Sequence, residues 1–162
     1  MLRADPNIKL IGIGGENFGR YTSNAFPEWN RKVLTLSGPR INYLALHNAY
    51  FPAILAEPAV TNVRRVYAAM LAAPLLISAN LDTVAAQIRK YAPTRPIKIA
   101  ITEWGPIFHI DQKSPWVDHV KTLGSALFVA STMKVFLEHP EVEIANAFTE
   151  LNDPDEQRAR FE

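Results

Sequence analysis

Four segments of the chain share one pattern, in which a run of apolar and often β-branched residues turns polar at its carboxyl end. They are residues 8–17, 41–50, 97–105 and 142–153. Runs of this length and composition are typical of buried β-strands. Because the carboxyl ends of parallel strands meet at one edge of a sheet, the pattern predicts that their polar residues gather on one rim.

The segments between these strands have helical spacing of their apolar residues. The expected helices are residues 27–36, 63–91 and 115–138, the second interrupted at Pro74 and the third capped by Ser114. Strands that alternate with helices are joined in parallel by right-handed crossovers. The sequence therefore predicts an α/β fold of order βαβαβαβ.

Such an alternation is compatible with a small open α/β domain or with part of a barrel. A complete (β/α)8 TIM barrel needs about 250 residues, whereas this chain has 162. The length therefore permits only half of a barrel. Residues 1–153 would form that half, and residues 154–162 would form a charged tail.

The composition is that of an ordinary globular chain, with 48% hydrophobic residues, 20% charged residues and a formal net charge of +1. This balance does not favour nucleic acid as a partner. The chain has no cysteine, and its 4 histidines lack the spacing of metal ligands. The glycines near the first strand do not have the G-x-G-x-x-G spacing of a dinucleotide site. We therefore expect neither a metal nor another cofactor.

The hydropathy pattern does not favour a membrane partner. No apolar run approaches the roughly 18 residues of a membrane span. The first ten residues carry charges where a signal peptide needs an apolar core. The sequence as written therefore predicts a cytoplasmic protein.

Several ordered blocks together resemble the second half of the catalytic barrel of the α-L-arabinofuranosidases of glycoside hydrolase family 51. The blocks are DPNIKLIGIGG, FPEWNRKVL, INYLALHNAY, MLAAPLLISANLDTVAAQIRKYAPTRPIKIAITEWG and GSALFVASTMKVFLEHPEVEIANAF. The most specific parts of these blocks are AAPL at residues 72–75, RPIKIA-x-x-EWG at residues 95–105 and ALFVA at residues 126–130. The resemblance covers nearly all of residues 5–153, and it implies that the four strands are strands five to eight of a TIM barrel.

The resemblance also implies a retaining glycosidase mechanism in which Glu103 is the nucleophile. In that mechanism one carboxylate attacks the anomeric carbon, and a second carboxyl group about 5 to 5.5 Å away acts first as acid and then as base. From the residues alone, Glu103 is a carboxylate at the open end of a rigid strand, which suits a nucleophile. The alternative is a solvated charge or a helix cap at the strand end.

His47 ends the second strand and should face the same rim as Glu103. The family has a histidine there, followed by two tyrosines of which the first contacts the nucleophile. This chain has Asn48, Ala49 and Tyr50 instead. Either Tyr50 replaces that contact through a local shift or the nucleophile is positioned differently. The alternative for His47 is a hydrogen-bonded rim residue without substrate contact.

Two further residues are candidates for sugar binding. Trp104 would form a wall of the sugar site or would fill the space between strand and helix. Asn146 lies on the last strand, where the family has a substrate-binding glutamine after an Ala-Asn pair, but no glutamine follows here.

The acid/base glutamate of the family follows an asparagine on strand four, and no Asn-Glu pair occurs in this chain. Three interpretations follow. The first is a fragment of a retaining furanosidase that is inactive alone and whose partner is a missing amino-terminal half barrel or a second copy of the chain. The second is a non-catalytic carbohydrate-binding or pseudoenzyme module, and the third is a self-contained α/β domain of another function.

Overall fold

The computed structural model describes residues 5, 7–15, 28–47, 49–50, 63–106 and 121–146. These residues form four strands and three helices: β1 (Ile11–Ile13), α2 (Trp29–Ser37), β2 (Tyr43–Leu46), α3 (Val63–Tyr91), β3 (Lys98–Ile101), α4 (Leu123–Glu138) and β4 (Val142–Ala145). The predicted βαβαβαβ order is confirmed. The predicted charged tail lies outside the described residues.

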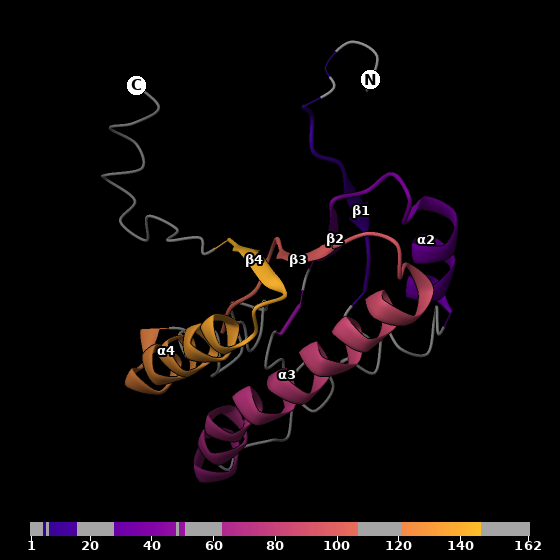
Figure 1. The fold of residues 1–162 in the computed structure, drawn as a ribbon. Coiled ribbons are helices and arrows are strands. Elements are labelled where there is room, and N and C mark those ends of the chain that lie inside the picture. Colours follow the sequence, from indigo (N-terminus) through magenta and orange to yellow (C-terminus); the bar gives the residue numbers. More distant parts are fainter. Residues whose placement is uncertain are drawn as a thin grey trace, which may run out of the picture.

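The four strands are parallel and lie in the order β1-β2-β3-β4. Figure 1 shows the three helices along one side of the row of strands, with α3 next to α4. Strands on the inside and helices on the outside are the layers of a barrel wall. Within the described residues β1 and β4 each pair with one neighbour only, so this wall is open at both edges.

The hydrophobic core lies between the two central strands and the helices. Leu44 and Leu46 of β2, Ile99 and Ile101 of β3 and Leu81 of α3 are all completely buried in one cluster. Alternate residues of each strand thus face the helices, as the pleat of a strand requires. Burial of each such side chain stabilises the fold by roughly 1.5–3 kcal/mol.

Helix α2 ends at Ser37, and Gly38 follows it as its cap. Gly38 has φ −47° and ψ −43°, so it does not provide a left-handed turn. Glycine is needed here because there is no room for a side chain. A Cβ atom at this position would lie 2.2 Å from the Leu34 carbonyl oxygen and 2.9 Å from the Cβ of Ala92. The helix begins at Trp29, two residues later than predicted, and Pro27 lies outside the described residues.

The predicted interruption at Pro74 is wrong, because α3 is one helix of 29 residues that includes Pro74. Proline removes one helical hydrogen bond and costs about 3 kcal/mol inside a helix. Met70 and Ile77, on either side of it, are each 1% exposed in the core. Burial of Met70 and Ile77 offsets the free-energy cost of the proline, so the helix continues through Pro74.

The predicted start of the third helix is also wrong. Thr122 has an extended backbone, with φ −99° and ψ 158°, and its hydroxyl accepts a hydrogen bond from the Ser125 amide, so α4 begins at Leu123. The proposed cap Ser114 lies outside the described residues. The end of the helix at Glu138, before Pro140, is confirmed.

One helix among the described residues is long and apolar enough, by length and composition, to cross a membrane, namely Arg64–Tyr91 of α3. This corrects the expectation that no segment reaches that length. The same helix carries Met70, Ile77 and Leu81 into the protein core. Only 33% of the helix's apolar 18-residue window is buried, and Leu75 and Leu76 are exposed, so packing accounts for part of the apolar composition.

The strand face turned away from the helices carries a polar network. The hydroxyl of Tyr43 donates to the carboxylate of Glu143 over 2.6 Å and accepts from the Lys9 ammonium over 3.1 Å. The hydrogen bond to Tyr43 and the electrostatic interactions with Tyr43 and then Glu143 raise the pKa of Lys9. Ile11 is the register partner of Tyr43. Ile11 and Ile13 therefore share this face, where they are 48% and 70% exposed.

We expect the chain to self-associate through these open edges, because unpaired strand edges with exposed apolar residues pair with other chains. Ile13→Lys should shift sedimentation towards the monomer, since an edge lysine opposes strand addition. Leu36→Lys, which changes an exposed leucine on α2, is the matched control and should leave association unchanged. A sharp monomer peak for the unmodified chain would contradict the expectation.

Candidate active site

Glu103 lies just beyond the carboxyl end of β3, where its main chain is held on the β2 side. The Thr102 amide donates to the Leu46 carbonyl, and the Ala49 amide donates to the Glu103 carbonyl, each over 2.9 Å. The ladder between β2 and β3 therefore continues past both strands. The Glu103 side chain keeps 36% of its surface exposed, so a rigid backbone presents a carboxylate that solvent can reach.

His47 is the first residue after β2, and it contacts Glu103 as predicted for two residues on one rim. Its Nε2 atom is 3.1 Å from a carboxylate oxygen of Glu103. Its Nδ1 atom is 3.1 Å from the hydroxyl oxygen of Thr102. The imidazole thus bridges two consecutive residues of the segment that follows β3, and it fixes the direction of the carboxylate.

The contact with Glu103 fixes which atom of His47 donates. A carboxylate oxygen accepts, so Nε2–H of the imidazole donates to Glu103. Nδ1 then either accepts from the Thr102 hydroxyl or donates to its oxygen, which also lies 3.3 Å from the Leu46 carbonyl oxygen. Both arrangements direct Nε2–H towards the carboxylate.

Asn146 follows β4 and lies next to the same segment. Its amide nitrogen donates to the Ile101 carbonyl over 2.8 Å, and its side-chain amide donates to the Thr102 carbonyl over 3.4 Å. The residue is exposed. The structure therefore brings Asn146 to the rim, where it supports the main chain before Glu103. A contact with sugar stays a prediction.

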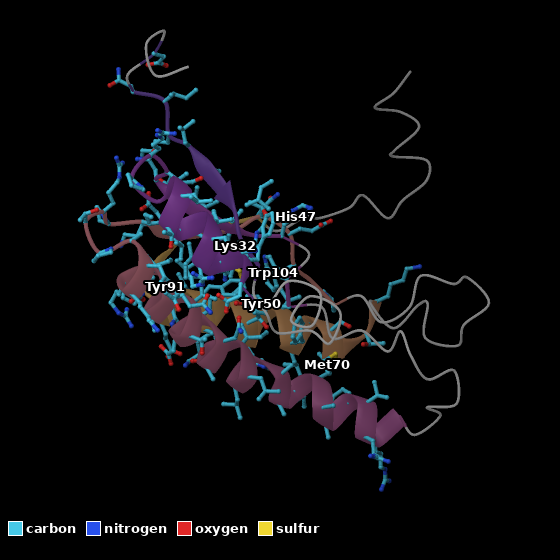
Figure 2. The ribbon with its side chains drawn as sticks, turned by 90° about the vertical axis from the view of Figure 1, so that its right-hand side faces the viewer. Lys32, His47, Tyr50, Met70, Tyr91 and Trp104 are labelled. Atoms are coloured by element: carbon cyan, nitrogen blue, oxygen red, sulfur yellow. The ribbon has the colours of Figure 1, made fainter. Side chains whose placement is uncertain are left out.

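Tyr50 does not share the rim with Glu103, which corrects the predicted position. Its backbone has φ 59°, an uncommon conformation for a residue with a large side chain. Its ring is 2% exposed, and its hydroxyl donates to the Asn80 side chain of α3 over 2.9 Å. The left-handed turn thus directs the ring into the core, between the strands and the long helices (Figure 2).

Trp104 fills the space between strand and helix, which was one of its two predicted roles. The indole is 7% exposed and packs edge-on against Phe136 of α4, with ring centres 4.9 Å apart. Tyr50 contacts the same ring, with centres 6.1 Å apart. In Figure 2 His47 lies near the strand ends, whereas Trp104 and Tyr50 lie deeper. A sugar contact by either aromatic ring stays a prediction.

Thr102 and Asn80 organise this region and were not predicted as site residues. Strand alternation would place Thr102 and Glu103 on opposite faces of the sheet. However, β3 ends at Ile101, so the alternation does not extend to these two residues. Asn80 had a detectable signal, because it is a polar residue three positions after Ile77 on the apolar side of α3.

A second cluster has the order serine, histidine and aspartate. Nε2 of the buried His139 is 2.9 Å from the Ser78 hydroxyl, and Nδ1 is 3.7 Å from an Asp82 oxygen. Ser78 lies inside α3, where helical hydrogen bonds already use the main-chain amides that could stabilise an oxyanion. The cluster connects the end of α4 to α3.

Within the described ranges, no three side chains of His, Asp or Glu are grouped to hold a metal ion.

The fold is part of a (β/α)8 barrel, with Glu103, His47 and Asn146 at the carboxyl ends of its strands. A similar solved structure is the crystal structure of the GH51 arabinofuranosidase from Xanthomonas axonopodis pv. citri, with a TM-score of 0.65 and 18% identity. The match covers 88% of this chain and 29% of that chain. No protein-family model matches the sequence. No curated protein matches it either. The structural match confirms the predicted partial-barrel fold.

We expect Thr102→Val to release His47, because valine has a similar shape but no hydroxyl to form the hydrogen bond with Nδ1. Nitrogen NMR of the imidazole should show a changed distribution of protons between Nδ1 and Nε2. Thr102→Ser keeps the hydroxyl and should preserve the original pattern. Identical imidazole spectra for Thr102→Val and the unmodified chain would show that Thr102 does not orient the ring.

Tyr50→Phe should lower the free energy of unfolding by about 1–3 kcal/mol, because it leaves the Asn80 side chain without its phenol donor in a part-buried position. Denaturant unfolding measures this effect. Asn80→Ala should cost a similar amount, and the double variant should cost less than the two single variants added together. Strict additivity would mean that the two side chains do not interact.

Proposed function

We propose that this chain is part of a retaining glycoside hydrolase that cleaves terminal α-L-arabinofuranosyl or related pentosyl residues from plant-type polysaccharides. The observation that carries the proposal is the Glu103–His47 contact at the carboxyl ends of β3 and β2, in a fold that matches part of a GH51 barrel. Enzymes with this fold place their catalytic groups at that end of the strands.

Glu103 is the proposed nucleophile. A carboxylate attacks the anomeric carbon well only when it is ionised and held in one direction. The contact with His47 supports the second condition, because a hydrogen bond over 3.1 Å restrains the rotation of the carboxylate. The attack forms the bond between a Glu103 oxygen and the anomeric carbon as the bond to the leaving oxygen breaks, and water later hydrolyses this ester.

The second carboxyl group of the mechanism comes, in this proposal, from a partner half barrel. Glu103 is the only carboxylate among the described residues that lies just beyond the carboxyl end of a strand. A second carboxyl group about 5 to 5.5 Å away must protonate the leaving oxygen. The chain spans 29% of the arabinofuranosidase that it matches, and strands from another segment would close the open edges of β1 and β4.

A non-catalytic carbohydrate-binding module is the second candidate. The observation that favours it is the buried position of Tyr50, since the phenol is bonded to Asn80 and does not orient Glu103. In such a module the rim would hold sugar through hydrogen bonds from His47 and Asn146 without bond cleavage. Both candidate functions predict that the rim binds sugar, but only the glycoside hydrolase predicts cleavage of the sugar.

The isolated chain should show no turnover of aryl α-L-arabinofuranosides, because the residues that the structure describes offer no second carboxyl group at the rim. Joined to the amino-terminal half barrel of a GH51 enzyme, it should become active, and Glu103→Gln should then lower kcat by roughly 10⁴-fold or more. Asp82→Asn, a change of an exposed carboxylate on α3, is the control and should retain activity.

A rescue experiment separates a nucleophile from a structural residue. In Glu103→Ala, added azide should restore cleavage, because the small anion occupies the vacated space and attacks the sugar itself. The product should be a glycosyl azide. Activity that survives Glu103→Gln would assign the nucleophile elsewhere, and sugar binding without any turnover would favour the binding module.

A further inference from the structure

A groove of about 370 Å³ lies at the opposite end of the sheet from Glu103. Its walls come from the last turns of α3, the connection to β3, the start of β3 and the residue before β4. Ile88 and Ile97, which are 5% and 4% exposed, contribute apolar surface to it. A volume of this size falls within the range of small-molecule sites.

Three cations and one carboxylate line the groove. Arg89 is neutralised, because its guanidinium is 3.1 Å from the carboxylate of Glu141. Arg95 and Lys98 bond instead to main-chain carbonyls, those of Pro39 over 3.1 Å and Pro140 over 3.0 Å. A carbonyl carries no net charge. Two positive charges in the groove therefore have no anionic partner among the described residues.

Arg95 and Lys98 are half-buried, so water screens their charges less than it would on a fully exposed surface. Each has donors to spare, since a guanidinium carries five N–H groups and an ammonium three. A fork of arginine donors matches the two oxygens of a carboxylate or the oxygens of a phosphate. The unused donors therefore suit an anion that lies over the apolar floor.

The other role for these cations is to offset the negative end of a helix. The last turn of α3 lines the groove and contributes roughly half a negative charge. Arg89, in that turn, is already paired with Glu141, so it leaves this partial charge to other cations. Arg95 and Lys98 lie beyond the helix and carry two full charges, so a positive excess remains after the helix end is counted.

We propose that this groove binds a small organic anion, in which a carboxylate or phosphate group pairs with Arg95 and Lys98 and a compact apolar body lies against Ile88 and Ile97. The site is separate from the proposed catalytic rim, because Lys98 begins the strand at whose far end Glu103 lies.

The test is a titration of the full chain followed by amide NMR with three probes. Benzoate has the anion and the apolar body, inorganic phosphate has only the anion, and benzamide is the neutral analogue of benzoate. We expect saturable shifts at Ile97, Lys98 and Glu141 with benzoate, weaker shifts with phosphate, and no saturable shifts with benzamide. Stronger binding of phosphate than of benzoate would assign the site to phosphate groups.

Variants identify the residues responsible. The double change Arg95→Gln and Lys98→Gln should weaken benzoate binding at least about tenfold, because it removes both unpaired charges. The matched control, Arg31→Gln with Lys134→Gln, removes two cations from surface ion pairs elsewhere and should bind benzoate normally. Arg95→Lys with Lys98→Arg keeps both charges and should retain binding, which guards against a folding effect.

Three results would overturn the proposal. They are equal binding of benzamide and benzoate to the unmodified chain, the same loss of affinity in the glutamine variant and its control, and no saturable shift at the groove with any probe. The first needs no substitution, so it decides the question even if the glutamine variant fails to fold.

Discussion

The parallel pairing of β2 with β3 is the constraint on which the rest of the structure depends. Leu46 is the register partner of Ile101, so the next residues, His47 and Thr102, leave the sheet side by side. Two main-chain hydrogen bonds beyond the strands extend the pairing as far as Glu103. A slip of one residue would turn every side chain of one strand to the other face. The contact between His47 and Glu103 therefore follows from the register of two buried strands.

The rim is also supported from below by packing. The rings of Tyr50 and Trp104 both contact Phe136 of α4, and the Tyr50 hydroxyl reaches Asn80 of α3. The segments that follow β2 and β3 are thus anchored to both long helices by side chains that are themselves buried. A reactive group keeps its geometry only when the residues around it are locked in this way. Burial of Tyr50 and Trp104 is therefore compatible with a functional rim, because they hold it in place.

The order of strands and helices could be predicted because burial on both sides demands apolar runs, and such runs are visible in the sequence. The closeness of His47 and Glu103 followed from the rule that parallel strands end together. The direction of Tyr50 could not be predicted, because it depends on a left-handed backbone that local sequence does not favour for tyrosine. The continuity of α3 through Pro74 was missed because the compensation comes from tertiary contacts of Met70 and Ile77.

The two ends of the sheet differ in charge for one reason. All strands are parallel and each helix follows a strand, so the helices begin at the Glu103 end and finish at the other. Helix beginnings carry partial positive charge and helix ends partial negative charge. A carboxylate is therefore favoured near the first end, and Arg89 and other cations are favoured near the second. Exclusion of water at either end would strengthen the electric fields of the helix termini. The common direction of the helices therefore favours an anionic side chain at the rim and cationic side chains at the groove. The excess of Arg95 and Lys98 beyond what α3 requires then makes the groove attractive to an anion from outside the chain.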